Sequence, residues 1–219
     1  TDADVTLNFD AVNKVYDTNS NISYNHSAAD YGDQAGSQDA ADYINQFIIG
    51  GVVLKNGQTD TKGENYSAAG IYLNSAGTET SGVDANKAKF TITLTDKALS
   101  NFDLSSVSFF DATAKTLTKT TDAGTASITP KNVTVSFHDP EVTKVYNGKK
   151  NVVAGSTQAN PDGTALAIGT NILNVSGIIS GDKAELDRDN VNARYADKNV
   201  AYDSAGKVTS TAIDRKSVV

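Results

Sequence analysis

Apolar and polar residues alternate along much of this chain of 219 residues. Val5, Leu7 and Phe9 are separated by polar residues, and the same alternation recurs at 90–94 and at 133–137. A period of two with threonine on the polar side indicates strands that have one face on a core and one in water. Turn signals, mostly Gly beside Asn, Ser or Asp, separate such runs: Asn56-Gly57, Ser81-Gly82, Asn147-Gly148, Pro161-Asp-Gly163 and Ser180-Gly-Asp182. The pattern predicts a mainly β fold, with antiparallel strands in a sandwich or a β-grasp-like sheet.

One segment, 39–49, has a different period. Its apolar side chains recur at the three- and four-residue spacing of a helix face: Ala40, Tyr43, Ile44, Phe47 and Ile48. Asp39 or Ser37 can cap the first turn, and Gly50 can take a left-handed conformation at the end. We therefore predict one short helix near 39–49, with this apolar face toward a sheet and Asp42, Asn45 and Gln46 toward water. The matching region 160–168 contains Pro and Gly and is a weaker helix candidate.

The chain repeats itself at long range. Val5-Thr-Leu-Asn-Phe9 and Val12-Asn-Lys-Val-Tyr-Asp17 are echoed by Val133-Thr-Val-Ser-Phe137 and Val142-Thr-Lys-Val-Tyr-Asn147. Further along, 51–54 (Gly-Val-Val-Leu) parallels 177–180 (Gly-Ile-Ile-Ser), and 89–96 parallels 207–214. Self-similarity of this kind is typical of a chain built from copied modules.

The repeat predicts two tandem modules. The first spans 1–131 and contains the helix, whereas the second spans 132–219 and is shorter. The residues after Asp96 in the first copy have almost no counterpart after Asp214. We expect either that the second module is short or that the natural protein continues past Val219.

Composition narrows the function classes. The chain has no Cys, which excludes disulfides, thiolate catalysis and Cys-based metal sites, and it has no Met, so Thr1 is not an initiator. The formal net charge is −7 and the Lys residues are scattered, which argues against nucleic-acid binding. No apolar run approaches the roughly 20 residues that a spanning helix needs, so we expect no membrane insertion of this piece.

Several motifs carry a family resemblance: 128–135 (Ile-Thr-Pro-Lys-Asn-Val-Thr-Val), 144–148 (Lys-Val-Tyr-Asn-Gly), 176–182 and 195–200. Together they resemble the YDG-type repeat of large secreted bacterial adhesins of the filamentous-haemagglutinin kind, chiefly over 128–214. Modules of that family run in tandem, each entering through a strand and a K-V-Y-D-G turn. The resemblance implies a non-catalytic, extracellular role at the bacterial cell surface, as a stalk or as an adhesive or biofilm-matrix module. It also implies neighbouring repeat modules, a host or matrix glycan, or a surface protein as partners in cell adhesion.

The repeated motif has a physical interpretation of its own. A Tyr followed by Asp or Asn suits a strand-to-turn transition, because the ring packs under the turn while the Asx side chain bonds the backbone two residues on. Tyr16 and Tyr146 are thus interpreted as packing residues. Lys14 and Lys144 are, by position, candidates for an isopeptide bond to Asn or Asp, and the sequence leaves that question open.

Catalytic residues are poorly supported, and we expect that the chain is not an enzyme. His26 and His138 are its two histidines, and no G-x-S-x-G nucleophile elbow occurs. We interpret both as solvated loop residues. Two carboxylate pairs could do acid–base work only in a cleft, which the sequence does not indicate: Asp139 with Glu141, and Asp187 with Asp189.

Two alternatives stay open. The same carboxylates, with Asn190, are calcium-ligand types at short spacing, but no D-x-D-x-D-G loop is present, so no cofactor is predicted and the metal ligands are left unassigned. The chain could also be a carbohydrate-binding module with a local sugar site. The lack of Trp argues against that function, whereas nine Tyr leave it open.

Overall fold

A computed structural model describes residues 4–57, 65–137, 151–152, 173–182, 193–194, 201–202, 204–205 and 208–209. The chain is mainly β, as predicted, with a few short helices. It divides into two compact units, Thr1–Asn132 (unit 1) and Val133–Val219 (unit 2), one residue after the boundary expected from the repeat. In the part of the chain that the structure describes, no helix is both long and apolar enough to cross a membrane.

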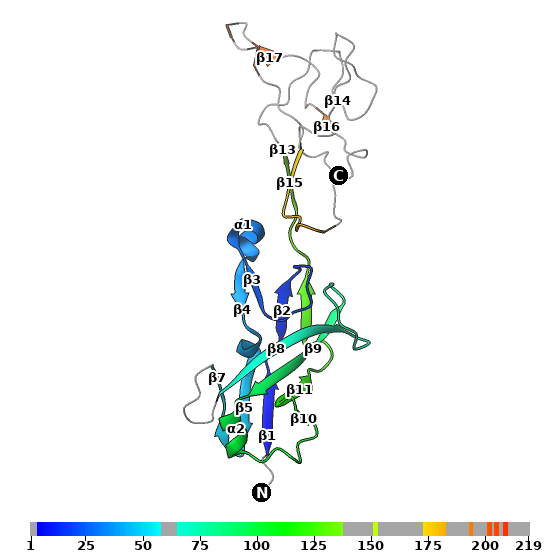
Figure 1. Cartoon of the computed structure of the whole chain (residues 1–219). Coiled ribbons are helices and arrows are strands. Elements are labelled where there is room, and N and C mark those ends of the chain that lie inside the picture. The colour runs from blue at the N-terminus through cyan, green and yellow to red at the C-terminus, as the bar shows by residue number, and fades with distance from the viewer. Residues whose placement is uncertain are drawn as a thin grey trace. The chain divides into compact units, whose positions relative to one another are not determined.

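The elements of unit 1 are short apart from one long hairpin (Figure 1). Its strands are β1 (Val5–Phe9), β2 (Val12–Val15), β3 (Tyr24–His26), β4 (Gly36–Gln38), β5 (Ile44–Ile49), β6 (Val52–Val53), β7 (Lys55–Asn56), β8 (Asn65–Asn74), β9 (Ala85–Leu94), β10 (Phe110–Asp111), β11 (Thr116–Thr120) and β12 (Ala126–Thr129). Its helices are α1 (Ala28–Tyr31) and α2 (Asp96–Asn101), with 3-10 turns η1 (Gly32–Gln34) and η2 (Ala40–Tyr43).

Unit 1 has two layers. One is a five-stranded sheet in the order β10-β11-β9-β8-β7, and the other combines the sheet β1-β5-β6 with the parallel pair β2–β12. Leu7 and Phe47 from the second layer join Ile92 and Leu117 of the first in one buried cluster. A second cluster joins β2 and β12 to β8 and β9, with Tyr72 fully buried in it. Both clusters therefore pack against the β8–β9 hairpin.

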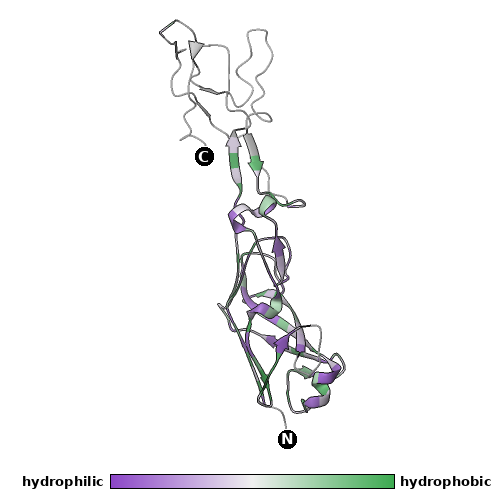
Figure 2. Ribbon diagram, turned by 90° about the vertical axis from the view of Figure 1, so that its left-hand side faces the viewer, coloured by the Kyte–Doolittle hydropathy of each residue, from purple (hydrophilic) through white to green (hydrophobic). Residues whose placement is uncertain are grey.

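The alternation in β9 follows the prediction. Phe90, Ile92 and Leu94 are buried, whereas Thr93 is exposed and pairs across the ladder with Thr116. Hydrophilic and hydrophobic residues are interspersed along the strands (Figure 2). The face of this sheet that points away from the core is thus rich in hydroxyl groups.

The predicted helix at 39–49 is wrong. Only 40–43 is helical, as the 3-10 turn η2, which Asp39 caps, and 44–49 is strand β5. Phe47 is buried as predicted, but it gets there by pairing opposite Leu7 of β1 rather than by lying on a helix face. The apolar spacing fits a helix, but a short apolar run such as Phe47-Ile48-Ile49 occurs in buried strands as well, and the β-branched isoleucines together with the β1 partner favour the strand.

Unit 2 contains short antiparallel pairs in its described part. Its strands are β13 (Thr134–Phe137), β14 (Asn151–Val152), β15 (Leu173–Ser176), β16 (Ala193–Arg194), β17 (Ala201–Tyr202) and β18 (Val208–Thr209). The pairs are β13 with β15, β14 with β16, and β17 with β18.

The first strand of each unit is paired in the same way. In unit 1, β1 pairs antiparallel with β5, and Gly50 follows β5 directly with a φ of 54°. In unit 2, β13 pairs antiparallel with β15, and Gly177 follows β15 directly with a φ of 92°. Glycine adopts such angles without the steric cost that other residues incur. In both units, therefore, the first strand pairs with a strand far along the chain, and that second strand ends at a glycine with a positive φ.

Candidate functional site

The repeated motif of unit 1 places a lysine inside the protein. In β2, Val12 and Lys14 are buried while Asn13 between them is exposed, as strand alternation requires. Only 3% of Lys14 is exposed, and none of its side chain. A buried lysine is uncommon and needs hydrogen-bond partners for its charge, so Lys14 and the groups around it form the candidate site.

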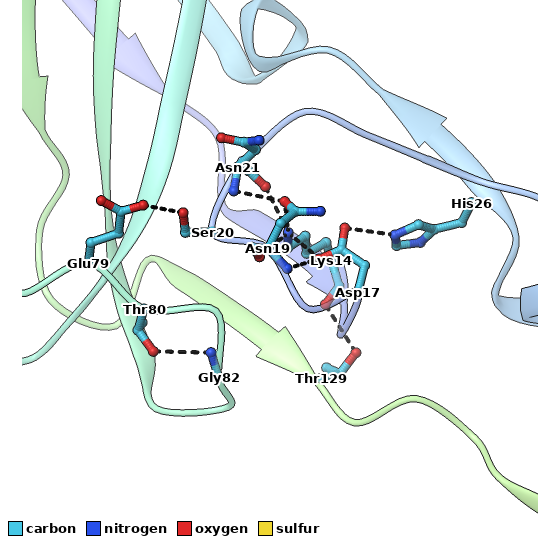
Figure 3. Close-up of polar contacts among 10 residues, drawn as sticks. All are labelled: Lys14, Asp17, Asn19, Ser20, Asn21, His26, Glu79, Thr80, Gly82 and Thr129. Carbon is cyan, nitrogen blue, oxygen red and sulfur yellow. Dashed lines mark hydrogen bonds and ion pairs between the residues drawn. The ribbon is translucent and has the colours of Figure 1, made fainter. Parts of the chain in front are cut away.

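Four oxygen atoms surround the Lys14 ammonium (Figure 3). Its Nζ lies 2.6 Å from Asp17 Oδ1, 2.7 Å from the Asn19 carbonyl, 2.8 Å from the Asn21 carbonyl and 3.1 Å from Asn19 Oδ1. It also lies 5.4 Å from the centre of the Tyr72 ring. Burial lowers the pKa of Lys14, and the hydrogen bond and charge of Asp17 oppose that shift. The three ammonium protons all have acceptors.

The loop that supplies these oxygens turns every second residue toward one centre. Asp17, Asn19 and Asn21 all contribute, and Thr18 between them takes a left-handed φ of 71°. Side-chain and backbone oxygens at alternate positions are also how a calcium loop holds its ion. Here the Lys14 ammonium fills that centre. Elsewhere in the described ranges, no three acidic or histidine side chains gather as metal ligands.

The same geometry bears on the isopeptide candidate. Lys14 is close to both a carboxylate and a carboxamide, as such a bond would require. Each contact is, however, a hydrogen bond from nitrogen to oxygen, and only a neutral amine has a lone pair for attack on carbon. The arrangement favours an ion pair with Asp17 over an amide bond.

The second oxygen of Asp17 contacts a buried histidine. His26 Nε2 lies 3.1 Å from Asp17 Oδ2, and only 5% of His26 is exposed. Its ring is stacked between Tyr24 at 4.4 Å and Tyr31 at 4.0 Å. The interpretation of His26 as a solvated loop residue is therefore wrong. It lies in β3, and the hairpin of β3 with β4 folds this strand over the Asp17 loop.

These contacts leave little room for catalysis by His26. A general base must reach the proton of a bound substrate, and tyrosine rings cover both faces of this imidazole. Its Nε2 already faces Asp17, and its Nδ1 is buried without a hydrogen-bond partner. The group can hold the 17–26 segment in place, but it offers no open reaction centre.

The loop that follows β2 also forms hydrogen bonds with the β8–β9 hairpin. Ile22 N donates to the Gly70 carbonyl at 3.0 Å, and Tyr72 N donates to the Ser20 carbonyl at 2.8 Å. A Cβ at Gly70 would lie 2.3 Å from Ile22 Cδ1 and 3.0 Å from the Lys89 carbonyl. Glycine at this point of β8 therefore lets the loop approach closely, because a side chain would force Ile22 to move.

Two tyrosine hydroxyls lie beside this loop. Tyr43 Oη donates to the Asn13 carbonyl at 2.8 Å, and burial together with Tyr24 raises the pKa of Tyr43 to about 12. Burial, with Tyr43 nearby, also raises the pKa of Tyr72, whose hydroxyl has no partner in the structure. Both hydroxyls stay protonated at neutral pH, so neither adds a charge to the loop.

The remaining sequence candidates have mixed outcomes. The Asx turn predicted at Asp17 is confirmed, since Asn19 N donates to Asp17 Oδ1 at 3.2 Å. Tyr16 is half-buried and packs against the second cluster, as a packing residue would. The other candidates lie outside the described residues: His138, Asp139, Glu141, Lys144, Tyr146, Asp187, Asp189 and Asn190.

Comparison with known proteins assigns no family to the chain. No family model matches the chain, and no curated protein or solved structure matches it significantly.

Proposed function

We propose that the chain is part of the repeat region of a bacterial surface adhesin, acting outside the cell as a non-catalytic stalk or adhesive module. One observation carries the proposal. The first strands of the two units have similar sequences, and each pairs antiparallel with a distant strand that ends at a positive-φ glycine. Tandem copies of one supersecondary unit suit a protein that must span distance or present many copies of a surface.

The use of the polar groups supports a structural role. The buried Lys14, Asp17 and His26 contact one another, their own loop and neighbouring tyrosines. In an enzyme, side chains with strongly shifted pKa values generally lie together in a cleft. Here they connect β2, the following loop and β3, so folding accounts for the lysine motif of unit 1.

The surface also suits a tandem array. The net charge is −7, and exposed Thr residues such as Thr93 and Thr118 lie on the outer face of strands β9 and β11. Like charge and scattered hydroxyls keep neighbouring modules from sticking together at high local concentration.

A local sugar site is the weaker candidate. Carbohydrate platforms need an open aromatic face. Among the residues that the structure describes, the large exposed apolar side chains are valines and one isoleucine, and Tyr24 and Tyr31 are stacked on His26. No specific observation therefore favours this alternative.

Parallel assays of the full chain test the proposal. The purified chain should hydrolyse no glycoside, ester or peptide substrate, and on a glycan array it should bind weakly as a free chain. Coupling many copies to one bead should raise avidity by about a hundredfold or more if the module is adhesive. Beads bearing Phe47→Asp, which puts a charge into the core, are the control. Robust hydrolysis that His26→Gln abolishes would overturn the proposal in favour of an enzyme.

A further inference from the structure

The last segment of unit 1 is held by hydrogen bonds to one side chain of the same unit. Strand β12 ends at Thr129, and Pro130–Asn132 follows it toward the start of unit 2. Gln34 Nε2 donates to the Pro130 carbonyl at 3.5 Å, and Asn132 N donates to Gln34 Oε1 at 2.9 Å. One carboxamide thus offers a donor and an acceptor, as the backbone of a neighbouring strand would.

A second contact holds the residue between them. Lys131 Nζ lies 4.7 Å from the centre of the Tyr31 ring. The other face of that ring is stacked on His26 at 4.0 Å and 6°, which leaves the cation only the opposite face. A cation over a tyrosine face is attracted by the ring quadrupole, so this contact stabilises the exit segment.

Local structure places both contacting side chains together. Ser27 caps α1 by accepting from Asp30 N at 3.2 Å, and Gly32, with a φ of 57°, turns the chain from α1 into η1. Tyr31 and Gln34 are three residues apart across this 3-10 turn, and such residues lie on the same side. The 27–34 segment therefore presents a ring and a carboxamide to the same short stretch of chain.

We infer that the 27–34 segment is a clamp for the exit segment Pro130–Asn132, and that the buried Lys14–Asp17–His26 group sets the position of the clamp through Tyr31. Asp17 fixes His26, His26 fixes the Tyr31 ring, and Tyr31 receives Lys131. This inference rests on the proposed function in one respect. In a tandem repeat the exit segment is the junction to the next module, so the clamp would hold each junction by contacts from inside one module.

Amide hydrogen exchange at Asn132, followed by NMR on the full chain, tests the clamp directly. Gln34→Ala removes the acceptor of the Asn132 N–H, and loss of one hydrogen bond should accelerate its exchange by about tenfold. Gln46→Ala is the matched control, because the Gln46 side-chain oxygen also accepts a hydrogen bond, from Asn8 Nδ2, and Gln46 lies in β5 rather than in the clamp. It should leave the Asn132 exchange rate unchanged.

Lys131→Met tests the ring contact separately, since it keeps the length of the side chain and removes the charge. It should accelerate exchange at Asn132 by a smaller factor, roughly threefold for a partly exposed cation–π contact. An Asn132 amide that exchanges freely in the wild type, or equal rates in Gln34→Ala and Gln46→Ala, would overturn the clamp. Either result would leave the adhesin proposal standing, because that proposal is tested by turnover and avidity.

Discussion

Replacing Lys14 with Met is the sharpest test of the buried ion pair. Methionine has a similar length and fits an apolar site, so the change removes the ammonium with little change in packing volume. It leaves the Asp17 carboxylate, whose side chain is 7% exposed, without its cation. It also leaves the Asn19 and Asn21 carbonyls without the donor that holds the loop together.

The expected loss is large. Removing one partner of a buried ion pair costs about 3–5 kcal/mol, because the other charge stays buried and uncompensated. For a unit of this size, that loss lowers the melting temperature by on the order of 10 °C. Lys115→Met is the matched control, since Lys115 pairs with Asp96 at the surface, where the two side chains are 48% and 82% exposed. An exposed pair contributes less than about 1 kcal/mol.

Urea unfolding followed by circular dichroism measures both variants against the wild type. The double variant Lys14→Met/Asp17→Asn should recover part of the loss, since it removes the orphaned charge, with a coupling of roughly 1–3 kcal/mol. If Lys14→Met unfolds at the same urea concentration as Lys115→Met, Lys14 is not buried as described. The interpretation of the repeated motif would then fail with it.

Three further predictions concern the same region. Gly70→Ala should destabilise unit 1 by about 1–3 kcal/mol through the contact with Ile22, and thermal melts should show a smaller cost in an Ile22→Val background; equal costs would contradict the contact. Since the pKa of Tyr43 rises from 10.0 to about 12 on folding, stability should hold below pH 10 and fall from there toward pH 12. The free energy of unfolding of Tyr43→Phe, measured with urea, should fall less steeply with pH than that of the wild type. Both proteins share the opposite contribution of Lys14, so the comparison cancels it. Identical slopes of free energy against pH would refute the assignment to Tyr43. The intact mass should equal that of the sequence, whereas a loss of ammonia would indicate an amide bond from Lys14 to Asn19 and a loss of water one to Asp17.

Periodicity predicted the strands well where a polar residue separates each pair of apolar ones. Val5–Phe9 and the buried positions 90, 92 and 94 follow the alternation, because threonine and asparagine leave only one way for the strand to face the core. At 44–49 the apolar spacing of Ile-Asn-Gln-Phe-Ile-Ile fits a helix, yet its last three residues form a short apolar run that buried strands also contain. The partner that decides between them, β1, is more than thirty residues away, which local spacing cannot register.

The candidate site was harder to predict, because it depends on burial. A lysine in an alternating strand usually faces water, and the immediate neighbours of Lys14 in β2 do not reverse that expectation. A signal did exist in the residues after it. Asp17, Asn19 and Asn21 at alternate positions are typical of an oxygen-lined loop, and such a loop needs a cation at its centre. The role of His26 required the β3–β4 hairpin, which the sequence pattern did not predict.

The oxygen-lined loop of unit 1 also has a consequence for how the protein depends on dissolved ions. A loop that relies on dissolved calcium loosens when the ion is diluted or taken up by a chelator, because occupancy depends on the free concentration. The cation at the centre of the Asp17–Asn21 loop is tethered to the same chain, five residues or fewer from most of its ligands. It cannot be washed out, so this loop should keep its shape in fresh water, in brine and in the presence of citrate alike.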